Sequence, residues 1–78
     1  MPTVLRHGPY RFFFYAGDGG EPPHIHVERD KNTAKFWLDP VRLQNSGGFG
    51  GTELNRIQRL VGDNVEDLSR SWNEYFNG

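Results

Sequence analysis

The run from Tyr10 to Tyr15 constrains the fold more than any other part of the chain, because five of its six residues are aromatic. Aromatic residues favour β-strands, in which successive side chains point to opposite faces of the sheet. Both faces of this strand therefore carry rings: Tyr10, Phe12 and Phe14 on one, and Phe13 and Tyr15 beside Arg11 on the other. The pattern predicts either a central strand covered on both sides or a strand whose second face meets a partner.

Three more segments favour extended structure. Residues 3–6 predict a short first strand, and residues 24–29 and 33–39 alternate with the period of a strand around a polar turn. The economical arrangement is a hairpin that points Ile25, Val27, Ala34, Phe36 and Leu38 inward. Its other face then carries His24, His26, Glu28, Lys35, Trp37 and Asp39.

The last third of the chain predicts two helices that pack on one face of the sheet. The apolar residues recur at helical spacing, and the packing residues expected are Leu54, Ile57, Val61, Leu68 and Trp72, with Tyr75 and Phe76 as further core. The expected fold is therefore a single α+β domain over residues 1–78. A three- to four-stranded antiparallel sheet (3–39) precedes a flexible, glycine-rich connector (40–51) and a helical pair (52–76).

Composition excludes several classes of function. A chain of 78 residues buries only about 60–65% of the surface that its unfolded form exposes, so a partner would add useful stability. The absence of cysteine excludes a disulfide framework, a thiolate zinc site and a thiol nucleophile, and it suits the cytoplasm. No apolar run is long enough to predict a membrane span, and the net charge of -1 lacks the basic surplus typical of nucleic-acid binding.

His24 and His26 form the most suggestive pair of side chains. On a strand they point the same way, about 6–7 Å apart, and neutral imidazole is a common metal ligand. Glu28 is the next residue on that face and completes a candidate set of metal ligands, with Asp39 or His7 as alternatives. A His-x-His pair is frequent by chance, so the favoured interpretation is that both rings pack beside Phe13 and Trp37, and no cofactor is predicted.

The same histidines also suit acid–base chemistry on RNA. One would act as base and the other as acid, while Lys35 or Arg11 would steady a phosphate. The acidic net charge weighs against this alternative. The glycine-rich loop at 17–20 lacks the lysine and the following helix of a phosphate-binding loop, so it is interpreted as a plain connection.

Four segments resemble a known family over nearly the whole chain: residues 8–15, 21–28, 35–40 and 72–76. The most specific is Glu-Pro-Pro-His-Ile-His-Val at 21–27. The chain is similar to the domain-of-unknown-function family 4160, short bacterial and archaeal proteins for which no chemistry is established. The resemblance implies a gene that is often adjacent to a second small gene, an arrangement like a toxin–antitoxin pair.

The expected function follows from the aromatic residues that two helices on one sheet face would leave uncovered. Phe13, Tyr15, His24, His26 and Trp37 are predicted to bind a partner, which is a second small protein encoded nearby or another copy of this chain. The leading hypothesis is a cytoplasmic protein-binding component of a toxin–antitoxin-like module. A small RNA-directed enzyme or a metal-binding protein that uses His24 and His26 remains the alternative.

Overall fold

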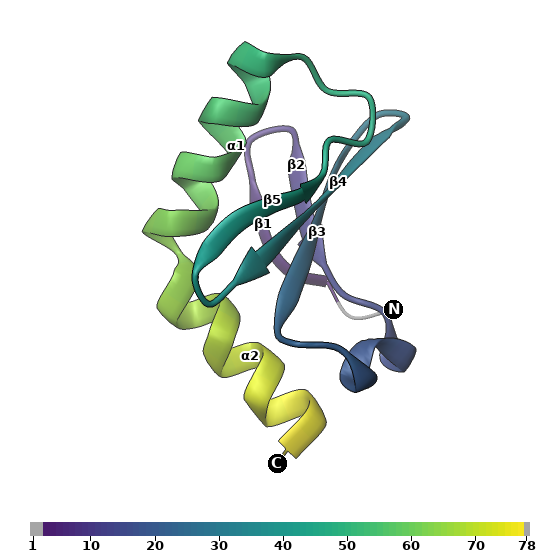
Figure 1. The fold of residues 1–78 in the computed structure, drawn as a ribbon, viewed down its shortest axis with the longest axis vertical. Coiled ribbons are helices and arrows are strands. Elements are labelled where there is room, and N and C mark those ends of the chain that lie inside the picture. Colours follow the sequence, from purple (N-terminus) through teal and green to yellow (C-terminus); the bar gives the residue numbers. More distant parts are fainter. Residues whose placement is uncertain (1–2, 78) are drawn as a thin grey trace.

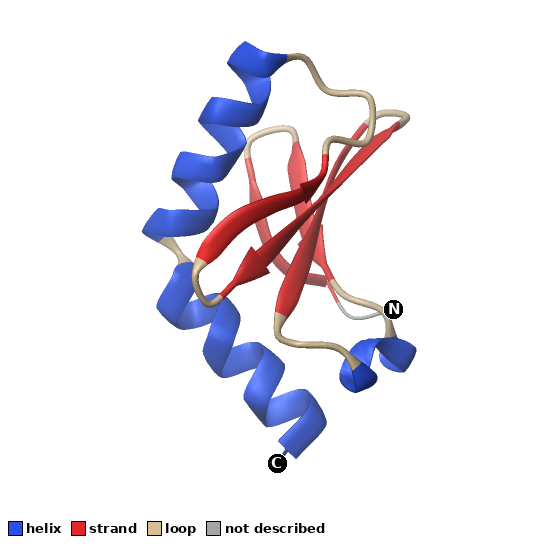
Figure 2. Cartoon of the chain, in the orientation of Figure 1, coloured by secondary structure: helices blue, strands red, loops and turns tan. Residues whose placement is uncertain are grey.

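The computed structural model describes residues 3–77 and confirms the predicted α+β class, with a five-stranded antiparallel sheet followed by two helices (Figures 1 and 2). The strands pair in chain order, so the sheet is a simple meander. A short 3-10 segment, η1, separates the second and third strands. The elements are β1 (Thr3–His7), β2 (Tyr10–Phe13), η1 (Ala16–Gly20), β3 (His24–Arg29), β4 (Asn32–Leu38), β5 (Val41–Asn45), α1 (Gly51–Asp63) and α2 (Val65–Asn77).

The fifth strand corrects the prediction of a connector from residue 40. β5 pairs with β4, with Val41 opposite Leu38 and Arg42 opposite Trp37. Pro40 lies in the turn that reverses the chain, where its missing amide proton is not needed, so it does not end the sheet. The connector shortens to residues 46–50, and it passes so close to β4 that a Cβ atom at Gly47 would collide with the carbonyl oxygen of Thr33.

Both helices lie on the same face of the sheet, as predicted (Figure 1). Ile57 and Val61 of α1 and Leu68 and Trp72 of α2 are buried, and Leu54 packs against the same core at partial burial. The inner-face pattern is confirmed as well, since the core contains Tyr10, Phe12, Phe14, Ile25, Val27, Ala34, Phe36 and Leu38. None of the helices in residues 3–77 is long and apolar enough to cross a membrane.

Two aromatic residues differ from the sequence-based expectation. Tyr75 was predicted to be core but is 48% exposed, because only one edge of its ring meets Phe14 while Trp72 and Phe76 face the sheet. Phe49, from the predicted connector, is buried in the core. The helical spacing of apolar residues therefore assigns one exposed residue, Tyr75, to the core, and it gives no indication that Phe49 is buried there.

A polar cluster ties the start of α1 to the sheet. The Glu53 carboxylate accepts hydrogen bonds from the Tyr10 hydroxyl (2.9 Å) and from Nη2 of Arg29 (2.7 Å). The bond from Arg29 is the main reason why the pKa of Glu53 lies below its ordinary value, and the bond from Tyr10 acts in the same direction. We call these three residues the Glu53 clamp.

Candidate functional site

The sheet face that turns away from the helices, here called the outer face, carries the predicted functional residues. Its strand residues are Arg11, Phe13, His26, Glu28, Lys35 and Trp37, and strand pairing sets them in rows. Tyr15, which follows β2, belongs to the same face, because its ring contacts Phe13 and His26. His26 lies between Phe13 on β2 and Lys35 on β4, while His24 lies opposite Trp37. η1 connects β2 to β3 at the end of this face, at the lower right of Figure 1.

The η1 segment brings a carboxylate to the two histidines. Oδ2 of Asp18 lies 3.0 Å from Nε2 of His24 and 3.2 Å from Nε2 of His26. One ligand atom from each of the three residues lies within 4.8 Å of the others. We call these residues the Asp18 cluster, and it is a two-histidine, one-carboxylate arrangement of the kind that binds transition metals.

Backbone contacts hold the cluster in this orientation. Nδ1 of His24 lies 2.9 Å from the carbonyl oxygen of Pro22. A carbonyl oxygen only accepts hydrogen bonds, so Nδ1 carries the proton and donates it. The Tyr15 amide donates to Oδ2 of Asp18 at 2.9 Å, which fixes the carboxylate across the turn.

Nε2 of His24 is the unusual atom of the cluster. It is buried and has no hydrogen-bond partner among residues 3–77, although Oδ2 of Asp18 is only 3.0 Å away. The two atoms are close to each other, but they lack the alignment that a hydrogen bond requires. Because Nδ1 of the same ring is bonded to the Pro22 carbonyl oxygen, Nε2 is the one ring nitrogen of His24 left without a hydrogen-bond partner among the described residues.

The ionisation of the cluster reflects burial and mutual contact. Partial burial of the Asp18 carboxyl opposes ionisation, but the Tyr15 amide and the two imidazoles outweigh it and lower its pKa below the ordinary value. Burial lowers the pKa of His26, and the neighbouring carboxylate of Asp18 offsets this only in part. The cluster therefore favours an ionised Asp18 beside a neutral His26 ring, whose Nε2 donates to Oδ2 of Asp18 at 3.2 Å.

Aromatic rings enclose the two histidines. The His24 ring is 0% exposed, with the ring centres of Trp72 at 4.9 Å and Trp37 at 5.8 Å. His26 stacks on Phe13, and the edge of Tyr15 completes its surroundings at 5.0 Å. The cluster therefore lies in a largely dry environment with solvent access mainly at His26 and Asp18.

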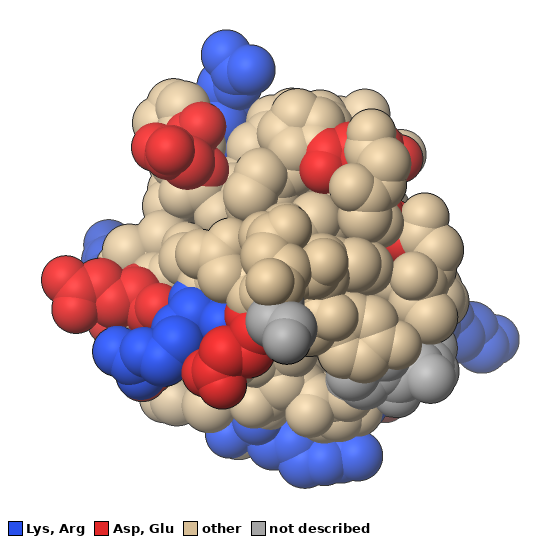
Figure 3. Space-filling model, turned by 90° about the horizontal axis from the view of Figure 1, so that it is seen from below, with Lys and Arg blue, Asp and Glu red and all other residues tan. Residues whose placement is uncertain are grey.

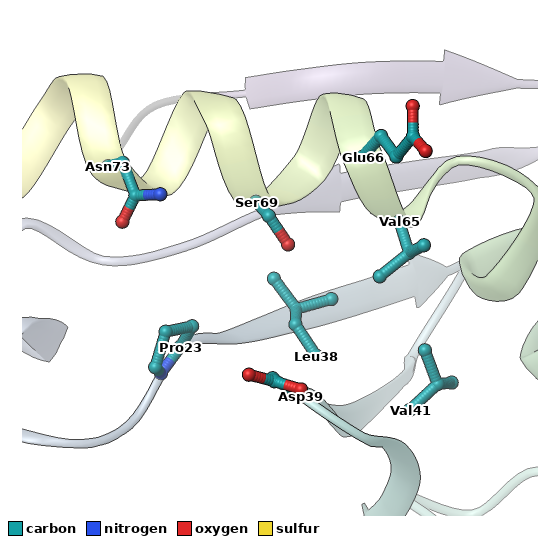
Figure 4. Close-up of a pocket in the computed structure, with 8 residues that line it drawn as sticks. All are labelled: Pro23, Leu38, Asp39, Val41, Val65, Glu66, Ser69 and Asn73. Atoms are coloured by element: carbon teal, nitrogen blue, oxygen red, sulfur yellow. The ribbon is translucent and has the colours of Figure 1, made fainter.

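The structure does not bring the other predicted ligands to the histidines. Glu28 forms an ion pair with Arg11 (2.8 Å). Lys35, the predicted phosphate contact, does lie beside His26 but is paired with Glu21 (2.6 Å). His7 lies opposite Tyr10, at the far end of β2 from the Asp18 cluster. Asp39 lies on a separate groove of about 580 Å³ between α2 and the turn before β5, beside Pro23, Leu38, Val41, Val65, Glu66, Ser69 and Asn73 (Figure 4).

Asp18 is the residue that sequence reasoning missed, because the loop at 17–20 was interpreted as a plain connection. The available signal was an aspartate between glycines, three residues after Tyr15, a spacing at which an Asp side chain caps a turn. Such a cap fixes the carboxylate but not the direction in which the loop folds. That direction depends on packing at the other end of the chain, where Phe76 lies so close to Gly19 that a Cβ there would collide with its ring.

The residues predicted to bind a partner are unequally accessible. Phe13 is 1% exposed, covered by Tyr15, His26 and the Arg11 guanidinium, which lies 4.3 Å above its ring. His24 is enclosed as well, so neither ring is available to a partner. Tyr15 is 46% exposed, and His26 and Trp37 are partly exposed, which leaves these three as the accessible residues of the predicted surface.

Of the comparisons with known proteins, the one with family models finds a match. No curated protein and no solved structure matches the chain. A family model does match residues 10–73, a range that includes the Asp18 cluster, four of the five strands and most of both helices. The chain therefore belongs to the family described as a domain of unknown function, DUF4160.

Proposed function

We propose that this chain is the protein-binding component of a two-gene, toxin–antitoxin-like module in the cytoplasm, and that it pairs through its outer face. The observation that carries the proposal is that both helices cover the same side of the sheet (Figure 2). The uncovered side presents the Tyr15 and Trp37 rings beside His26. Exposed aromatic residues are enriched at the centres of protein interfaces.

Charges of both signs surround these rings. Arg11 pairs with Glu28, and Lys35 pairs with Glu21 while its Nζ lies 4.9 Å from the ring centre of Trp37. Figure 3 views the end of the molecule from below, and on that side acidic and basic side chains are intermingled without a large area of one sign. Mixed charges around an aromatic centre suit a protein partner better than a polyanion, and the net charge of -1 supports the same conclusion.

The position of His24 weakens the alternative of an RNA-directed enzyme. An acid–base pair needs both imidazoles within reach of the substrate. His24 is fully enclosed, and its Nδ1 is bonded to the Pro22 carbonyl oxygen. Lys35, the predicted phosphate contact, is already paired with Glu21.

Co-expression with the small protein encoded beside this one, followed by size-exclusion chromatography with light scattering, tests the proposal. Tyr15→Ala should weaken the complex, because it removes the most exposed ring of the outer face. Tyr75→Ala is a matched control, since Tyr75 is equally exposed, at 48% against 46%, but lies on α2. An unchanged complex with Tyr15→Ala, or a wild-type chain that elutes alone, would overturn the proposal, and a dimer of the chain alone would identify a second copy as the partner.

A further inference from the structure

We propose that the Asp18 cluster binds one divalent transition-metal ion of the zinc class through Oδ2 of Asp18, Nε2 of His24 and Nε2 of His26. This inference is independent of partner binding. It goes beyond the sequence-based metal candidates, because Asp18 replaces Glu28 and the third ligand comes from a loop.

The first support is the buried Nε2 atom of His24. It lies 3.0 Å from Oδ2 of Asp18 without a hydrogen bond to it, and no other partner among the described residues satisfies it. An unpaired buried polar atom is costly, so native structures rarely leave one without a role. An ion between Nε2 of His24, Nε2 of His26 and Oδ2 of Asp18 would give this atom a partner and coordinate all three residues.

The second support is the spacing of the ligand atoms. Zinc binds imidazole nitrogen and carboxylate oxygen at about 2.0–2.2 Å, so the ligand atoms of a tetrahedral ion lie roughly 3.3–3.6 Å apart. The distances from Oδ2 of Asp18 to the two histidine nitrogens, 3.0 and 3.2 Å, are slightly shorter than this, and all three ligand atoms lie within 4.8 Å of one another. Small side-chain rotations would open the cluster around an ion without moving the strands.

The third support is the shell around the ligands. A metal-binding histidine usually donates its other ring N–H to a carbonyl or carboxylate oxygen, and Nδ1 of His24 does so to Pro22. The Tyr15 amide holds the Asp18 carboxylate in the same way. Pro22 is followed by Pro23, so the chain that supplies this carbonyl is stiff.

The ligand set also limits which ions fit. The chain has no cysteine, and two imidazoles with one carboxylate suit Zn²⁺, Co²⁺ and similar ions better than Ca²⁺ or Mg²⁺, which prefer oxygen ligands alone. Three protein ligands leave a tetrahedral ion one further position, which water or a bound molecule takes. The partly exposed side chains of His26 and Asp18 place that position toward solvent.

Titration of the full-length, EDTA-treated chain with Zn²⁺ and with Co²⁺ tests the inference. We expect one equivalent to bind and raise Tm, with Ca²⁺ and Mg²⁺ ineffective. Asp18→Asn, which keeps the side chain's shape, should weaken the Kd for Zn²⁺ at least about tenfold. Glu28→Gln is the matched control, because Glu28 was the carboxylate expected from the sequence, and it should leave the Kd unchanged.

Imidazole ¹⁵N NMR of the unmodified chain provides a test that does not depend on how variants fold. Zn²⁺ should shift the Nε2 resonances of His24 and His26 and leave those of exposed His7 in place. The inference is overturned if one equivalent of Zn²⁺ does not bind, if all three histidines respond alike, or if Asp18→Asn and Glu28→Gln bind equally well. The Tyr15→Ala chromatography described above is a separate readout, so either proposal can fail without the other.

Discussion

The Glu53 clamp and the Asp18 cluster lie at opposite ends of β2 and β3, and each joins one carboxylate to two residues of the sheet. Glu53 meets two donors, the Tyr10 hydroxyl and the Arg29 guanidinium, so every contact pairs a donor with an acceptor. Asp18 meets two imidazoles, one of which has a buried nitrogen without a hydrogen-bond partner among the described residues. In the Glu53 clamp the carboxylate meets donors from the chain itself. In the Asp18 cluster, Nε2 of His24 has no hydrogen-bond partner among the described residues, and this difference distinguishes a structural contact from a candidate binding site.

The largest expected effect comes from removing a wall of the Asp18 cluster. Trp72→Ala should lower the free energy of unfolding by about 3–5 kcal/mol, because the buried indole packs against Phe14, His24 and Phe76. Urea denaturation followed by far-UV circular dichroism measures the loss. Tyr75→Ala, three residues along the same helix, should cost much less, and equal losses would contradict the burial pattern described for α2.

A smaller effect is expected from a substitution in the Glu53 clamp. Glu53→Gln removes the charge that Arg29 meets and should lower Tm by less than Trp72→Ala does. The measurement is thermal unfolding at pH 7. No change in Tm would mean that the Glu53 clamp is a solvent-screened surface pair that contributes nothing to stability.

The contribution of the Glu53 clamp to stability should change with pH in a defined direction. The pKa of Glu53 is lowered in the folded chain, so its contribution is present above the ordinary value of 4.5 and is lost as pH falls through the folded pKa. Stability of the wild type should therefore fall more steeply below about pH 4.5 than that of Glu53→Gln. The measurement is a series of urea titrations from pH 7 to 3. Equal losses of stability in the wild type and in Glu53→Gln as the pH falls would contradict this assignment.

The smallest effect is expected from a substitution in the Asp18 cluster. Asp18→Asn in metal-free protein should leave the free energy of unfolding within about 1 kcal/mol of wild type, because the amide oxygen of Asn can still accept from the Tyr15 amide and Nε2 of His24 has no hydrogen bond to lose. In the presence of Zn²⁺ the wild type should gain stability and the variant should not. A metal-free loss larger than that of Glu53→Gln would reverse the comparison and make the Asp18 cluster a structural contact.

The fold was predictable because its pattern is local. Alternation over residues 24–29 and 33–39 and the helical spacing of Ile57, Val61, Leu68 and Trp72 each place a side chain on the correct face from sequence neighbours alone. β5 was missed because residues 40–51 were interpreted as a flexible connector, whereas Asp39 and Pro40 form a two-residue turn that leads into β5. The error concerns turn chemistry and does not affect the periodicity.

The candidate site was predictable only in part. His24 and His26 share one strand, so their common direction follows from the period of two, but the residue that joins them comes from a loop. The path of that loop depends on contacts made by α2, some 50 residues later in the chain, and no local pattern near Asp18 encodes them. Burial of His24 was likewise unpredictable, since its strand position alone assigns it to an open face.

The rings around His24 have an optical consequence. The chain contains two tryptophans, and both border this one imidazole, Trp72 at 4.9 Å and Trp37 at 5.8 Å between ring centres. Indole emission responds to charge and to ring contacts in its immediate neighbourhood, so nearly all the intrinsic fluorescence of the protein originates beside a single side chain. Any event that changes the His24 ring is therefore reported by the unlabelled protein itself.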